Sequence, residues 1–127
     1  MKNFYLVIFF LLSCTYICRG QQPGARVEAI KIAFITKELN LSPAEAQRFW
    51  PVFNSYSNEV KVARNTYPND EISFTEALVS IQKKYKPDFK SILVIEDRVN
   101  RAFIVERQFR EMLRKTVTDR QQQKRYH

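Results

Sequence analysis

Apolar residues recur every three or four positions along most of the chain after residue 25, which is the spacing of a helix face. No segment shows a sustained alternation of apolar and polar residues, so the pattern favours an all-α protein. The first helix is predicted over about residues 26–39 and is ended by Asn40. Its apolar stripe is formed by Val27, Ile30, Phe34, Ile35 and Leu39.

The second predicted helix has the clearest start in the chain, at Leu41-Ser42-Pro43. Ser42 can accept a hydrogen bond from the backbone N–H of Glu45, and the Glu45 carboxylate can accept one from the N–H of Ser42. Pro51 lacks a backbone N–H, so we expect a kink there. The apolar face of this helix is formed by Phe49, Trp50, Phe53, Tyr56, Val60 and Ala63.

A third helix is expected after a loop at residues 67–70. The apolar-Ser-x-x-Glu arrangement recurs at Ile72, Ser73 and Glu76, which predicts a second capping box with Ser73 as N-cap. Pro87 is expected to interrupt this helix, whose apolar pattern continues beyond it. The last and longest helix is predicted from about Ile95 to Gln122, and a basic tail from about residue 121 is expected to fray.

The first 20 residues have a different pattern, typical of a secretory signal peptide. Lys2 precedes an apolar run over residues 4–12, which is too short to cross a bilayer as a stable helix, and small residues before Gln21 suit cleavage after Gly20. We therefore expect a signal peptide over residues 1–20, a single domain over residues 21–127, and a periplasmic location. A buried N-terminal helix is the alternative for this segment.

Both cysteines, Cys14 and Cys18, lie inside the expected signal peptide. Cleavage after Gly20 leaves a chain without cysteine and therefore without disulfides. The second possible outcome is lipidation, because Leu11-Leu12-Ser13-Cys14 is similar to a bacterial lipobox and would make Cys14 a lipidated first residue. Only in that case do we expect the protein to be held on a membrane.

Charge is unevenly distributed in the remaining chain. Removing 20 of 127 residues leaves 107, and because Lys2 and Arg19 are lost the net charge falls from +8 to +6. Residues 101–127 hold +5 of this charge and residues 21–100 only +1. The positively charged surface of the last helix is expected to attract anionic partners. We select four arginines of the last helix as candidate client-binding residues, on charge density alone: Arg101, Arg107, Arg110 and Arg114.

The residues needed for most enzyme chemistry are missing. The one histidine is His127 at the C-terminal end, and without a Cys/His cluster we expect no metal site. Gly24 is the one glycine left after residue 20, so a phosphate-binding loop is not expected either. We expect no catalytic residues, no enzyme activity and no cofactor, and export argues against nucleic acid as a partner.

These features together resemble those of a known family. An exported, basic, all-helical chain with two helix starts of the form apolar-Ser-x-x-Glu resembles the Spy/CpxP-like periplasmic proteins, whose signature Leu-Thr-x-x-Gln is present twice. The matching triplets are Leu41, Ser42 and Glu45, then Ile72, Ser73 and Glu76. A closer resemblance, over residues 30–43, 49–56 and 106–113, is to small exported Bacteroidetes proteins labelled "sensor of ECF-type sigma factor".

The resemblance implies a bent four-helix subunit with kinked helices that pairs into a cradle-shaped homodimer. It also implies an ATP-independent chaperone that binds unfolded polypeptides of the cell envelope. The alternative that it implies is a regulatory protein of the stress response, which binds a membrane sensor or an anti-sigma factor. A purely structural envelope protein stays a third hypothesis.

Overall fold

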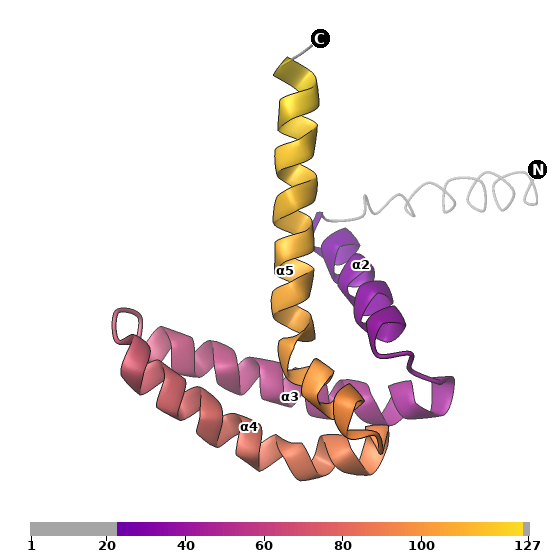
Figure 1. The fold of residues 1–127 in the computed structure, drawn as a ribbon, viewed down its shortest axis with the longest axis vertical. Coiled ribbons are helices and arrows are strands. Elements are labelled where there is room, and N and C mark those ends of the chain that lie inside the picture. The colour runs from indigo at the N-terminus through magenta and orange to yellow at the C-terminus, as the bar shows by residue number, and fades with distance from the viewer. Residues whose placement is uncertain (1–22, 126–127) are drawn as a thin grey trace, which may run out of the picture. The chain divides into compact units, whose positions relative to one another are not determined.

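The computed structural model describes residues 23–125, and within this range the protein consists of four helices without strands (Figure 1). The helices are α2 (Pro23–Glu38), α3 (Pro43–Thr66), α4 (Glu71–Leu93) and α5 (Glu96–Arg125). This confirms the all-α prediction. The expected signal peptide, Cys14 and His127 lie outside the described residues.

The chain divides into two compact units, residues 1–30 and 31–127. The described part of the first unit is the beginning of α2, where Val27 and Ile30 are 43% and 42% exposed. These two members of the predicted stripe are thus not buried, whereas Ile35 and Leu39 in the second unit are completely buried. Every contact described below lies within the second unit.

The core of the second unit is an aromatic cluster between α3, α4 and α5. Phe89 of α4 is completely buried, and its ring centroid lies 5.6 Å from that of Phe49, 5.8 Å from that of Tyr56 and 5.4 Å from that of Phe103. Phe53 stacks on Phe49 with centroids 5.1 Å apart. The apolar face predicted for residues 49–63 is therefore a core face, which is the usual role of aromatic residues at helical spacing.

The two internal prolines do not end their helices. α3 continues through Pro51 and α4 through Pro87, so the predicted interruption at Pro87 is wrong, although the expected kinks stay a prediction. The contacts of Phe89, Ile92 and Leu93, all buried beyond Pro87, stabilise the helix after the proline. α5 likewise runs on to Arg125, past the predicted end at Gln122, and the predicted fraying stays a prediction.

α4 begins one turn earlier than predicted. Its N-cap is Asp70, whose carboxylate accepts hydrogen bonds from the backbone N–H of Ser73 at 3.0 Å and from the Ser73 hydroxyl at 2.7 Å. The second capping box is therefore a wrong prediction: Ile72, Ser73 and Glu76 lie inside the first turns of α4. Asp70 caps the helix by accepting from the Ser73 N–H, so Ser73 is the third residue of the helix and its hydroxyl acts as a donor to Asp70.

The connection from α2 to α3 is a tight turn. Asn40 has φ 48°, and the N–H groups of Asn40 and Leu41 donate to the carbonyls of Lys37 and Thr36 at 3.0 Å each. This is the Schellman arrangement, in which a left-handed residue closes a helix and satisfies two of its last carbonyls. Asparagine adopts this backbone more readily than most residues.

The connection from α4 to α5 is tighter still. Val94 has φ 61° and ψ −50°, and the N–H of Ile95 donates to the carbonyl of Leu93 at 2.6 Å, which closes a γ-turn. A β-branched residue in this region has a strained backbone, at a cost of roughly 1–3 kcal/mol. Contacts on both sides of the turn therefore have to hold it in place.

Candidate functional site

A groove of about 600 Å³ lies between α3, α4 and α5 and is a candidate binding site. Its apolar surface comes from all three helices: Val60 from α3, Phe74 and Leu78 from α4, and Phe103 and Ile104 from α5. Its size is in the range of pockets that bind small ligands or single side chains of a partner. We call it the α3–α5 groove.

Four cationic side chains line the α3–α5 groove, against the single carboxylate of Glu106. Lys61 and Arg64 are three residues apart on α3, and Arg107 and Arg110 are three apart on α5, so each pair shares one helix face. The surplus of positive charge beside apolar side chains makes this groove suited to ligands that are both anionic and apolar.

Two contacts within the protein fix residues of the groove lining in pairs. The Ser57 hydroxyl donates to the Glu106 carboxylate at 2.7 Å, which connects α3 to α5 along the groove. Arg64 lies over the Phe74 ring, 3.4 Å from its centroid, and its Nη1 is 2.6 Å from the Glu71 carboxylate. A cation held against an aromatic face in this way has a defined position at the rim.

The structure separates the four arginines that the sequence analysis selected. Arg107 and Arg110 are exposed and line the groove together, whereas Arg114 lies one turn beyond it, exposed on α5. Arg101 is half-buried and donates to the carbonyl of Glu38 at 3.1 Å, while its Nη2 is 2.8 Å from the Asp97 carboxylate. Arg101 therefore stabilises the fold. The two other cations that line the groove, Lys61 and Arg64, were not among the predicted residues.

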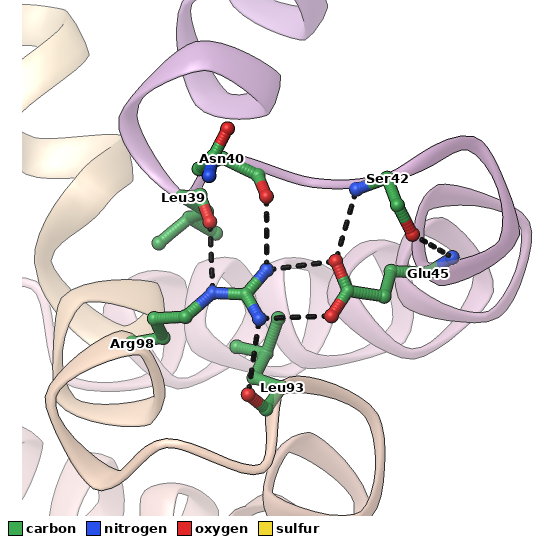
Figure 2. Close-up of polar contacts among 6 residues, drawn as sticks. All are labelled: Leu39, Asn40, Ser42, Glu45, Leu93 and Arg98. Carbon is green, nitrogen blue, oxygen red and sulfur yellow. Dashed lines mark hydrogen bonds and ion pairs between the residues drawn. The ribbon is translucent and has the colours of Figure 1, made fainter.

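The first predicted capping box is confirmed, and it is part of a larger polar cluster. Both halves of the box are present: the Ser42 N–H donates to the Glu45 carboxylate at 2.9 Å, and the Glu45 N–H donates to the Ser42 hydroxyl at 3.2 Å. Leu41, the apolar residue before the cap, is buried. Glu45 uses its carboxylate a second time, toward Arg98 of α5 (Figure 2).

Arg98 uses all five of its N–H donors, as Figure 2 shows. Nη1 and Nη2 each donate to one oxygen of Glu45 at 2.8 Å, so the ion pair is bidentate. The other three donors bind the carbonyls of Leu39, Asn40 and Leu93 at 3.0, 3.1 and 3.1 Å. This cluster, which we call the Arg98 clamp, joins the end of α2, the start of α3 and the end of α4.

The Arg98 clamp lowers the pKa of Glu45 from 4.5 to about 2, first through the hydrogen bonds from Arg98 and then through the Ser42 N–H. Because the folded state favours the charged carboxylate, its contribution to stability is full above about pH 5 and is lost as the pH falls through 4.5 towards about 2. The lowered pKa of Glu45 therefore predicts that the free energy of unfolding decreases as the pH falls below about 5.

We expect Glu45→Gln to unfold at lower urea concentration than the wild type at neutral pH, and to lose less further stability between about pH 5 and pH 2. Urea unfolding followed by circular dichroism at steps across this range measures both. Some slope will remain, since the pKa values of Glu59, Asp70 and Glu96 are also lowered by their hydrogen-bond donors. Parallel curves for the two proteins would contradict the prediction.

Neither a metal site nor a membrane-spanning helix is found in the part of the chain that the structure describes. Residues 23–125 contain no group of three or more histidine, cysteine or acidic side chains placed to hold a metal ion. None of the four described helices is long and apolar enough to cross a membrane. Comparison with family models, curated proteins and solved structures found no match.

Proposed function

We propose that the protein is an ATP-independent periplasmic chaperone of the Spy/CpxP-like type, which binds unfolded polypeptides and slows their aggregation. The observation that supports this most is the α3–α5 groove, where apolar side chains lie beside four cations. Unfolded chains expose apolar side chains together with charges. A groove of this kind accepts such side chains while the client backbone stays in water, so it needs no particular client sequence.

The charges of the groove have two effects on such clients. Cations at the rim attract acidic segments over distances of about 10 Å at moderate salt, and the apolar floor then holds a side chain by removing it from water. Lys61 and Arg107 form no ion pair or hydrogen bond within residues 23–125, and Arg110 is only 3.8 Å from Glu106. Within the described residues the charges of Lys61 and Arg107 are therefore not neutralised by an ion pair, whereas Arg110 forms a long one with Glu106.

The proposal includes a homodimer and helices kinked at Pro51 and Pro87. Exposed apolar residues at the start of α2 support an interface between copies: Val27 and Ile30, three residues apart, are 43% and 42% exposed. Apolar residues gathered on one helix are a common feature of subunit interfaces. Sedimentation equilibrium measures the assembly, and a monomer at all concentrations would remove the dimer from the proposal.

The test of the chaperone proposal is aggregation of a chemically denatured client, followed by light scattering with the protein at equimolar concentration. We expect the wild type to suppress scattering and Arg107→Glu/Arg110→Glu to bind about tenfold more weakly, because two rim charges are reversed. The matched control is Arg120→Glu/Lys124→Glu, which makes the same charge change on the exposed end of α5 outside the groove.

Three results would count against the proposal. The wild type could leave aggregation unchanged, or the control variant could lose as much activity as the groove variant, which would mean that overall charge and not the groove matters. Capture of one saturable partner from an envelope extract, in place of many unrelated clients, would favour the regulatory alternative, a protein that binds a membrane sensor or an anti-sigma factor.

A further inference from the structure

The α3–α5 groove offers few neutral polar groups to a ligand. The Ser57 hydroxyl is already used, because it donates to the Glu106 carboxylate at 2.7 Å. Tyr56, Asn65 and Gln82 are the other neutral polar residues of the lining. A peptide backbone that entered the groove would need a partner for every amide group, and each group left without one costs free energy. An alkyl chain has no such groups.

The dimensions of the groove suit an extended alkyl chain. Its α3 side runs from Tyr56 to Asn65, which at 1.5 Å per residue is about 13 Å. Along this length the floor is formed by Val60, Leu78 and Ile104, which are half-buried, with the Phe74 ring beside them. Covering these side chains with an alkyl chain removes apolar surface from water on both partners.

The charges at the rim determine which head group such a chain would have. Lys61 and Arg107 have no ionic partner among residues 23–125, and they approach the groove from different helices. An arginine fork binds a carboxylate with two parallel hydrogen bonds, and a lysine adds a point charge. A cationic or neutral head group would gain neither interaction.

We propose that the α3–α5 groove binds a single-chain anionic amphiphile of the fatty-acid class. Its alkyl chain lies on the floor between α3, α4 and α5, and its carboxylate lies at the rim formed by Lys61 and Arg107. This proposal does not depend on the chaperone function: the groove binds the amphiphile whether or not the protein also protects unfolded clients, and a failure of either leaves the other to be judged on its own measurement.

Isothermal titration calorimetry of the full-length protein with dodecanoate, kept below its micelle concentration, tests the proposal. We expect saturable binding of one dodecanoate per chain. Dodecyltrimethylammonium has the same alkyl chain with the opposite charge, and acetate has the same head group without the chain. Neither is expected to bind saturably, because each lacks one of the two interactions.

Two variants locate the site. Arg107→Glu, an exposed position, is expected to weaken dodecanoate binding at least about tenfold, as is Leu78→Gln, which places a polar group on the floor. Arg120→Glu makes the same charge change outside the groove and is expected to bind as the wild type does. Circular dichroism confirms that each variant is folded before titration.

The proposal is overturned by any of three results. These are no saturable heat with dodecanoate, equal binding of dodecyltrimethylammonium, or equal loss in Arg107→Glu and Arg120→Glu. The second result would show that apolar contacts alone cause the binding. The third would show that binding depends on the net charge of the protein and not on the groove. Weak binding by Arg107→Glu and Leu78→Gln, with an unaffected control, supports the groove as the site.

Discussion

Arg98→Ala is expected to destabilise the protein by about 3 kcal/mol, because it removes a bidentate ion pair and leaves four acceptor groups without their donor. The Arg98 side chain is only 14% exposed and that of Glu45 25% exposed, so water replaces the lost donors incompletely. For a domain of this size the loss corresponds to a fall in Tm of more than about 10 °C.

The position of Arg98 explains why the effect is large for one side chain. It binds the carbonyls at the C-terminal end of α2 and the carbonyl of Leu93 before the strained Val94 turn, so a single guanidinium holds two helix ends. Positive charge at the negative end of a helix dipole is favourable in addition to the hydrogen bonds. Without the arginine, both connections lose their support together.

Thermal unfolding by circular dichroism measures this prediction. Arg98→Lys is expected to recover only part of the loss, since a lysine cannot reproduce the planar bidentate contact or reach three carbonyls at once. Arg120→Ala removes an exposed arginine from the same helix and is the control, with an expected change of less than about 0.5 kcal/mol. Equal Tm values for Arg98→Ala and Arg120→Ala would show that the clamp does not stabilise the fold.

The helices could be predicted because their evidence is local. The apolar residues of α3 and the capping box at Ser42 lie within one stretch of sequence, and both are found as expected. The start of α4 shows how local evidence also misleads: Asp70 and Ser73 are both good N-caps one turn apart, and the sequence analysis chose Ser73 for its pairing with Glu76. The structure uses Asp70, whose carboxylate then holds Ser73 twice.

The two polar sites depend on residues far apart in the sequence, so no pattern within one helix reveals them. Arg98 is separated from its partner Glu45 by 53 positions and from Leu39 by 59. Charge density alone selected Arg101 with Arg107 and Arg110, although Arg101 faces the end of α2. The spacing of Lys61 and Arg64 matches that of Arg107 and Arg110, but only the packing of α3 against α5 brings the two pairs to one groove.

Phe89→Ala is expected to cost about 4 kcal/mol, since it leaves a cavity where a completely buried ring contacts three others. Phe49 and Tyr56 of α3 and Phe103 of α5 all meet Phe89, so the loss reaches each helix that forms the α3–α5 groove. Because Phe103 also lines the groove, we expect dodecanoate binding to weaken together with stability in this variant.

Urea unfolding measures the change in stability. The variant Phe89→Leu distinguishes the loss of aromatic ring contacts from the loss of side-chain volume. Leucine fills most of the volume, so its cost is expected to be about 1–2 kcal/mol. Substitution of the half-buried Ile81 of α4 by alanine is the control, with a smaller loss than Phe89→Ala. If Phe89→Ala were no more destabilising than Ile81→Ala, the aromatic cluster would not be what holds α3, α4 and α5 together. The helices around the groove would then have to be held by the Arg98 clamp and by the Ser57–Glu106 hydrogen bond.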